Sequence, residues 1–286
     1  MNKFLALLLL AGPAWAGADA PFLWEAQGAA ARHFFLGSVH MLPETAYPLP
    51  AALESAYAAS KAVVFEADLA QLAAPELQGR MLGAAKEDRP GGLRAQLGKP
   101  LYSKLQKRAE ILGMPVPVCD GFRAWFCALT LELYALQQAG FEAQRGIDQY
   151  FYSKARDDGR PIAGLETPAQ QLALFTGMPD AMSASLLAAT LDEHTTASQS
   201  PEEFVRLWRS GDVEALETIV SQLRRRHADV YARLLADRNR AWLPQLLERL
   251  NGDQPTLVVV GAAHFAGPDG LLALLKARDF ELKPPE

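Results

Sequence analysis

The sequence HFFLGSVH occupies residues 33–40, and LVVVGAAH occupies residues 257–264. Each is an aromatic or aliphatic run that ends in a glycine, and a histidine follows three residues after that glycine. The motif G-x-x-H thus occurs twice and ends at His40 and His264. Runs of this composition favour buried strands. Helical patterns lie between them, which predicts an α/β fold with a largely parallel central sheet covered by helices.

Two further strands are expected to end in glutamate. AVVFEAD, residues 62–68, places Glu66 directly after an apolar run, and PIAGLET, residues 161–167, does the same with Glu166. The carboxyl ends of parallel strands lie along one edge of a sheet, where ligands bind. His40, Glu66, Glu166 and His264 can therefore converge, although they are far apart in sequence.

Two imidazoles and one or two carboxylates suit a divalent ion such as Zn²⁺, Mn²⁺ or Co²⁺. Each glycine would let the chain turn sharply after its strand, so that the histidine points back over the sheet edge. A carboxylate that is not a ligand can act as the general base for the attacking water. Under the alternative, the histidines cap helices or hydrogen-bond within loops, and the glutamates are solvated strand ends.

The composition is that of a folded globular protein. Of 286 residues, half are apolar, and 28 basic side chains face 33 acidic ones. The acidic balance excludes a surface that coats nucleic acid. Two cysteines exclude a disulfide-rich scaffold, and after the N-terminus no apolar run approaches the roughly 20 residues of a membrane span. The partner expected is a small substrate, and the sequence leaves the oligomeric state open.

Residues 1–16, MNKFLALLLLAGPAWA, have the pattern of a secretory signal peptide. A lysine precedes a short apolar core, and an A-x-A site follows it. We therefore expect a mature chain of residues 17–286 in the periplasm or outside the cell. Cys119 and Cys127 would then form a disulfide, which is favoured, or remain as two small buried side chains.

The elements that we expect are bounded by turn and capping residues, and no linker divides the chain into two domains. A helical excursion, about residues 177–250, precedes the last long strand and forms a subdomain. Gly113 is expected to end one helix. The strands expected cover FLWEAQ at 22–27, 33–40, 62–65, 160–165, 256–260 and a short one at 280–282; clear helices are expected at 49–59, 122–139, 146–158 and 270–277.

The motifs resemble the TraB/GumN family, which includes the Tiki-type membrane metalloproteases. The resemblance rests on LWEAQ and LGSVH near the start, VVFEAD at 63–68, RGIDQYFYSKARDDGRPIAGLETPAQQ in the middle, and ADRNRAWLPQL and VVVGAAHFAGPDGLLALLKARDFEL at the end. Ser38 stands where the family usually has threonine. The resemblance implies an α/β fold and a metal-dependent hydrolase site. It also extends to a wider superfamily with erythromycin esterase-like enzymes and a haem-binding lipoprotein.

Together, the residues and the resemblance predict an exported metal-dependent hydrolase, with peptide bonds as the substrate. His40, His264 and Glu66 are the expected ligands, because the Glu66 strand follows the His40 strand after one helix and should lie next to it. Glu166 would be the base and Arg238 would stabilise the oxyanion, although the two glutamates can exchange roles. The alternative is a binding protein that holds a metal, haem or a signalling peptide without turnover.

Other polar residues are assigned supporting roles. Asn239 would orient a ligand and Asp148 would support one. The alternative for Arg238 is a helix-surface residue paired with an acidic neighbour. Asp68 is either an additional ligand or the cap of the next helix. Arg123 is expected to form a structural ion pair, and His33 is expected at the surface.

Overall fold

The computed structural model describes residues 21–115, 117–196 and 201–285. The expected signal peptide, residues 1–16, lies outside the described residues. Among those described, no single helix has the length and apolar character to cross a membrane. One bent pair of helices, Pro168–Thr176 with Asp180–Asp192, meets that test jointly.

The centre of the fold is a five-stranded sheet, which confirms the expected α/β class. Its strands stand in the order β1 (Leu23–Gln27), β2 (Arg32–Ser38), β7 (Thr256–Gly261), β4 (Ala62–Phe65) and β6 (Ile162–Gly164). Only β1 runs antiparallel to its neighbour. The other four strands are parallel, so their carboxyl ends share one edge. A second, two-stranded sheet joins β3 (Leu42–Pro43) to β5 (Phe141–Glu142).

The central strand of the sheet is β7, and it lies between β2 and β4. Its first five residues are all buried, as expected for a strand covered on both faces. In register, Val259 pairs with Leu36 on one side and with Phe65 on the other. The expectation that the Glu66 strand adjoins the His40 strand is therefore wrong, because the strand that leads to His264 separates them. Runs that are buried on both faces have no pattern that tells a central strand from its neighbours.

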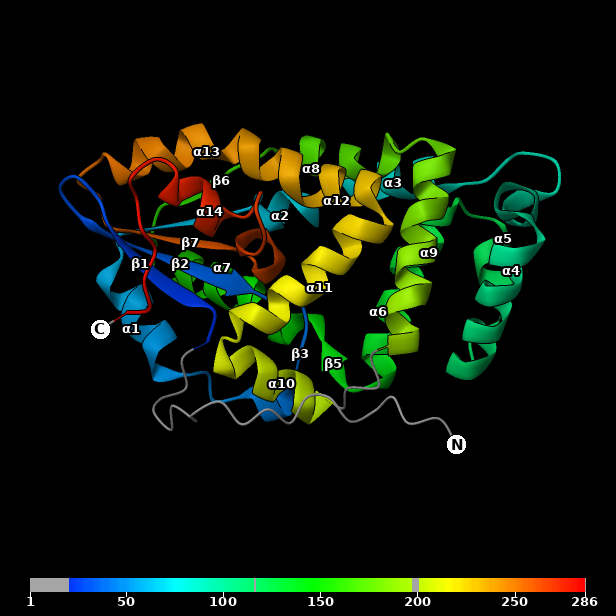
Figure 1. The fold of residues 1–286 in the computed structure, drawn as a ribbon, viewed down its shortest axis with the longest axis horizontal. Helices are drawn as coiled ribbons and strands as arrows, with labels where there is room; N and C mark the ends of the chain where they lie inside the picture. Colours follow the sequence, from blue (N-terminus) through cyan, green and yellow to red (C-terminus); the bar gives the residue numbers. More distant parts are fainter. Residues whose placement is uncertain (1–20, 116, 197–200, 286) are drawn as a thin grey trace.

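Helices cover both faces of the sheet, with α13 above it and α1 below it in the view of Figure 1. The helices are α1 (Ala51–Ala59), α2 (Leu69–Leu72), α3 (Pro75–Ala85), α4 (Gly92–Leu112), α5 (Pro117–Asp120), α6 (Ala124–Gln138), α7 (Ile147–Asp157), α8 (Pro168–Thr176), α9 (Asp180–Thr196), α10 (Pro201–Ser210), α11 (Val213–Arg226), α12 (Ala228–Tyr231), α13 (Asp237–Leu250) and α14 (Leu271–Lys276). Short turns η1 (Glu44–Ala46), η2 (Ala143–Arg145) and η4 (Ala262–Phe265) are 3-10 helices, and η3 (Ala232–Ala236) is a π-helix.

The helical part of the molecule has a hydrophobic core of its own. Figure 1 shows α4, α5 and α9 at the end of the molecule away from β1. Side chains of α4, α6 and α9, among them Leu105, Trp125 and Leu187, form a buried cluster separate from the cluster around the sheet. Of the helices within the stretch 177–250, α9 shares this core with helices that precede it in sequence, whereas buried side chains of α10 and α13 belong to the core around the sheet. The disulfide between Cys119 and Cys127 lies in this cluster and confirms the favoured pairing.

Several local expectations can be compared with the structure. Gly113 ends α4 in the left-handed conformation, with φ of 66°. Arg123 pairs with Asp180 at 3.0 Å, which is the structural role expected for it. The strand expected at 280–282 does not form; instead, Lys283 makes an isolated antiparallel bridge with Glu25.

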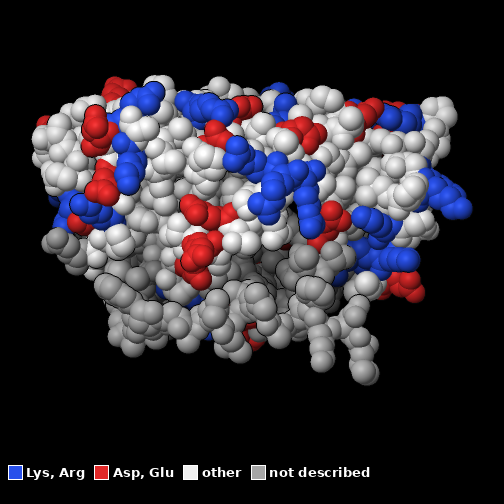
Figure 2. Space-filling view, in the orientation of Figure 1, with Lys and Arg blue, Asp and Glu red and all other residues white. Residues whose placement is uncertain are grey.

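Figure 2 shows basic and acidic side chains interspersed over one face, in keeping with the mildly acidic composition.

We predict that the Cys119–Cys127 bridge stabilises the helical cluster. Removing it in the double variant Cys119→Ala/Cys127→Ala should lower the free energy of unfolding by about 2 kcal/mol, because the bridge closes a short loop in the unfolded chain. Urea denaturation with and without a reducing agent measures the effect. The reducing agent should destabilise the unaltered protein and leave the double variant unchanged; equal sensitivity in both would contradict the prediction.

Candidate functional site

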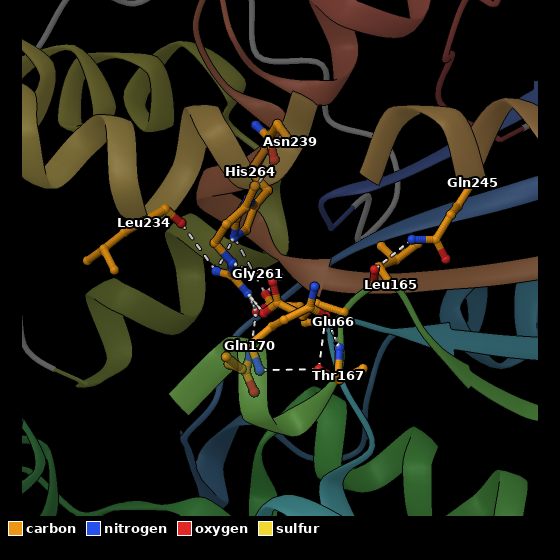
Figure 3. A network of polar contacts seen from close by, with 12 residues as sticks. Glu66, Leu165, Thr167, Gln170, Leu234, Asn239, Gln245, Gly261 and His264 are labelled. Atoms are coloured by element: carbon orange, nitrogen blue, oxygen red, sulfur yellow. Dashed lines mark hydrogen bonds and ion pairs between the residues drawn. The ribbon is translucent and has the colours of Figure 1, made fainter. Parts of the chain in front are cut away.

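The guanidinium of Arg238 connects three of the four predicted strand-end side chains. Its Nη2 donates to Glu66 Oε2 at 2.5 Å and to Glu166 Oε1 at 2.6 Å, and its Nε donates to Glu166 Oε2 at 3.2 Å. Its Nη1 lies 3.0 Å from His264 Nε2. Figure 3 shows this network around Glu66, with Gly261 and His264 beside it. The convergence predicted for Glu66, Glu166 and His264 is therefore present.

The position of Arg238 is fixed by its own helix. Trp242 lies four residues later on α13, which places the two side chains on one face. The guanidinium lies 4.6 Å from the ring centroid of Trp242, and the Trp242 ring lies 4.5 Å from that of His264. The side chain of Arg238 is only 10% exposed. Trp242 is thus both a core residue and a platform for the site.

Glu66 is held by neighbours from three elements besides its own strand. The backbone amide of Gly261 donates to its Oε1 at 2.8 Å, and Gln171 Nε2 donates to its Oε2 at 3.1 Å. Burial alone would raise the pKa of Glu66, but the neighbouring His264 and Arg238, together with the Gly261 amide, outweigh it, so the pKa lies below the usual range. Glu66 is therefore a carboxylate over the whole physiological range.

The glycine of the second G-x-x-H motif is required for space. Gly261 has φ of −50° and ψ of 136°, a conformation open to other residues, so the expected sharp turn does not depend on glycine. A Cβ at this position would lie 3.2 Å from Glu66 Oε1. A Cβ on Gly37, in the first motif, would lie 2.7 Å from Phe22 Cβ. Both glycines allow close approach of neighbouring groups.

The hydrogen bonds of His264 determine which of its ring nitrogens carries hydrogen. Asn239 Nδ2 donates to the carbonyls of His264 and Asp269, so its Oδ1 faces His264 Nδ1 at 2.6 Å and must accept from it. Nε2 then has the free lone pair, toward which Arg238 points. Burial and the Arg238 charge lower the pKa of His264 to about 3, with Glu66 opposing them. The ring is neutral at pH 7.

His40 differs from His264 in exposure, although the two motifs are alike. Its side chain is 69% exposed, and its Nδ1 lies 3.0 Å from Asp148 Oδ2. The Asp148 carboxylate, 16% exposed on α7, raises the pKa of His40. His40 lines the same pocket as Glu66, Arg238 and His264. Asp148, which was expected to support a ligand, therefore contacts His40.

Glu166 has the opposite electrostatic setting to Glu66. Its backbone amide donates to the carbonyl of Glu66 at 2.9 Å, which joins the ends of β4 and β6. Its side chain is 9% exposed. Burial raises its pKa, as does the charge of Glu66, and the Arg238 charge offsets only part of this. Of the two glutamates, Glu166 is the one that takes up a proton more readily.

The predicted ligand set fits a divalent ion in the chemistry of its donors. His264 presents an unprotonated Nε2, and Asp148 holds His40 by Nδ1, as carboxylates hold metal-binding histidines. His264 Nε2 lies 3.7 Å from Glu66 Oε1. Over 21–115, 117–196 and 201–285, no three His, Cys, Asp or Glu side chains are already grouped at ligand spacing. The Arg238 guanidinium makes the contacts that an ion would make with Glu66 and His264.

Two pockets open at this network and share Arg238. One, of about 550 Å³, is lined at one end by His40, Glu66, Asp148 and His264 and elsewhere mostly by apolar side chains. The other, of about 830 Å³, is lined by Glu166, Trp242 and residues of α8 and α13. The candidate site is therefore accessible from two sides, with both glutamates at its centre.

The model of the TraB/PrgY/gumN family matches residues 22–284, which covers both histidine motifs and both glutamates. The chain belongs to the TraB/PrgY/gumN family. Within the family, the uncharacterised protein YbaP of Escherichia coli K12 is 26% identical over 251 residues, 86% of this chain and 88% of its own length. YbaP of Shigella flexneri is 25% identical over the same shares. No solved structure matches the chain.

Some residues of this TraB/PrgY/gumN chain differ from expectation. Asp68 caps α2 by accepting from the Gln71 amide at 3.1 Å, so its role is the capping one. His33, expected at the surface, is 1% exposed, because it begins the buried run of β2. Sequence reasoning missed Gln171 as a partner of Glu66, and no pattern singles it out. It also missed Trp242 as a neighbour of Arg238, although the four-residue spacing between them was visible.

We predict that His264 makes the protein less stable in acid. Its folded pKa of about 3 lies below the ordinary value of 6.5. Below pH 6.5 the unfolded chain therefore binds a proton that the folded chain does not, and stability falls as pH falls. Between pH 7 and pH 5 this amounts to about 2 kcal/mol.

Urea denaturation of the unaltered protein and of His264→Gln at the two pH values measures this loss. The variant should be less stable at pH 7 but should lose about 2 kcal/mol less on acidification. The same pH-dependent loss in both proteins would show that His264 is protonated in the folded state.

Proposed function

We propose that this chain is an exported hydrolase that uses a divalent metal ion and cleaves peptide bonds. The observation that carries the proposal is the convergence of Glu66, Glu166, Arg238 and His264 at one sheet edge, beside a pocket that His40 also lines. A buried glutamate pair, an unprotonated imidazole and a guanidinium are the groups that hydrolysis of a carbonyl compound needs. The family membership supports a shared site, but the relatives named above are uncharacterised.

His264, His40 and Glu66 are the residues that we assign to the ion. His264 offers Nε2 while Asn239 holds its Nδ1–H, and Glu66 remains ionised. When bound, a divalent ion would polarise the substrate carbonyl and make water more acidic. The ion and Arg238 would share Glu66, so binding requires the guanidinium to give up part of its contact with that carboxylate.

Glu166 and Arg238 are the residues that we assign to the reaction itself. The raised pKa of Glu166 suits a general base that takes a proton from water and returns it to the leaving amine. Arg238 carries three donor nitrogens, and it can stabilise the negative charge that develops on the carbonyl oxygen. The hydrogen bonds from Arg238 to Glu166 keep base and oxyanion donor next to each other.

The proposal of export rests on the N-terminal pattern and is supported by the disulfide. Cys119 and Cys127 are bonded, and such bonds persist in oxidising compartments such as the periplasm. The expected location is therefore the periplasm or the medium. N-terminal sequencing of the protein recovered from the cell envelope would detect cleavage after Ala16.

The metal site is tested by elemental analysis of protein purified without chelators. His40→Ala, His264→Ala and Glu66→Gln should each abolish the retention of Mn²⁺, Co²⁺ or Zn²⁺, because each removes one of three ligands. His227→Ala, which alters a histidine at the start of α12, serves as the control and should retain metal. Unchanged retention in all three site variants would refute the site.

The reaction is tested with a peptide library in the presence of Mn²⁺, Co²⁺ or Zn²⁺. Glu166→Gln should reduce kcat by about 100-fold or more, as expected for loss of a general base, and leave metal content unchanged. Glu248→Gln is the control. It alters an exposed glutamate on α13, the helix that carries Arg238, and should leave kcat unchanged. Metal retention without cleavage of any peptide would favour the alternative function, a binding protein without turnover.

A further inference from the structure

The pocket of about 550 Å³ has a polar end and an apolar wall. The polar end contains His40, Glu66, Gln171, Arg238 and His264, which belong to the candidate site. The wall is formed by side chains of α2, α3, α6, α8 and η3. Its side chains include Leu72, Leu77, Met81, Leu129, Phe175 and Leu234.

The wall side chains are only partly buried. All six are half-buried, whereas large apolar residues of the two cores are almost fully buried. Met81, Leu129, Phe175 and Leu234 pack on one side against the cluster of α4, α6 and α9. Their remaining surface faces the pocket. Apolar surface left open in a concave site favours an apolar group that would remove it from water.

The charges of this pocket are confined to one end. Its ionisable lining residues are His40, Glu66, Asp148, Arg238 and His264, all at the polar end. Apart from the amide of Gln78, the side chains of this wall are apolar and none is charged, so burying an unpaired charge there would be costly. The geometry therefore separates a reactive end from a selective end within one pocket.

We propose that the pocket selects a bulky apolar side chain, leucine, methionine or phenylalanine, on the residue next to the cleaved peptide bond. This rests on the proposed function, because it assumes that the bond lies at Arg238, which lines this pocket and is hydrogen-bonded to Glu166 of the neighbouring pocket. In the reaction the oxygen of water bonds to the carbonyl carbon, the C–N bond breaks, and a proton from water passes to the leaving nitrogen. Leu72, Leu77, Met81, Leu129, Phe175 and Leu234 are then specificity-determining residues, and none of them takes part in the chemistry.

The first experiment compares peptides acetyl-Ala-Ala-X-Ala-Ala-amide with Mn²⁺ present. X is leucine, methionine, phenylalanine, alanine, serine, lysine or aspartate. The value of kcat/KM should be at least about 10-fold higher for the three bulky apolar residues than for alanine, and lower again for lysine and aspartate. Cleavage at similar rates throughout the series would overturn the specificity and leave the hydrolase itself standing.

Two pairs of variants place the selection in this pocket. Met81→Gln and Leu129→Gln alter the wall, and Leu82→Gln and Leu133→Gln alter neighbours on the same helices that are 50% and 44% exposed. The wall variants should reduce the preference for leucine over alanine by about 10-fold, and the control variants should retain it. Equal effects within each pair would exclude this wall as the source of the preference.

A binding measurement separates failure of the specificity from failure of the hydrolase. Glu166→Gln is titrated by calorimetry with the leucine and the aspartate peptides, without turnover. Tighter binding of the leucine peptide supports the pocket assignment, even if the unaltered protein cleaves neither peptide. In that case the proposed hydrolysis is refuted and the apolar preference of the pocket stands. Equal affinity, or no binding of the leucine peptide, overturns the pocket assignment whatever the outcome for cleavage.

Discussion

The ion pairs of Arg238 with Glu66 and Glu166 determine the arrangement of the sheet edge. Two carboxylates from neighbouring strands, both about one-tenth exposed, would repel each other without a cation between them. The guanidinium supplies that cation, and its planar donors contact both carboxylates and His264. Trp242 and the carbonyl of Leu234 restrict where the guanidinium can lie. The site is thus a compact charge network built from β4, β6, β7 and α13.

The same network explains why the two glutamates differ. Glu66 receives the Gly261 amide and Gln171 in addition to Arg238, and its pKa falls. Glu166 relies on Arg238 for its charge balance, and its pKa rises. Environments that push the pKa values of paired carboxyl groups apart assign them different roles. Sequence alone left these roles interchangeable, because both residues simply follow apolar strands.

Much of the fold could be predicted because strands and helices differ strongly in hydrophobic pattern. β4 was predicted at its observed bounds, and β7 to within one residue, since both are short apolar runs that end at a charged residue or a glycine. The order of the strands could not be predicted, because strands buried on both faces look alike. The predicted site residues lie on one edge, as parallel strands require. The place of Arg238 between the glutamates, the exposure of His40 and the burial of His33 depend on tertiary packing that no local pattern encodes.

The π-helix η3, Ala232–Ala236, stands directly before Arg238. A π turn inserts one extra residue relative to an α-helix, and one residue corresponds to about 100° of rotation around the axis. The residues that follow, including Asn239 and Trp242, are therefore rotated by about 100° around the helix axis, compared with their positions in an uninterrupted α-helix. A family member that lacks this surplus residue would present a different face of the same helix to the sheet. The length of this one turn, rather than the identity of its side chains, selects which residues of α13 meet the strands.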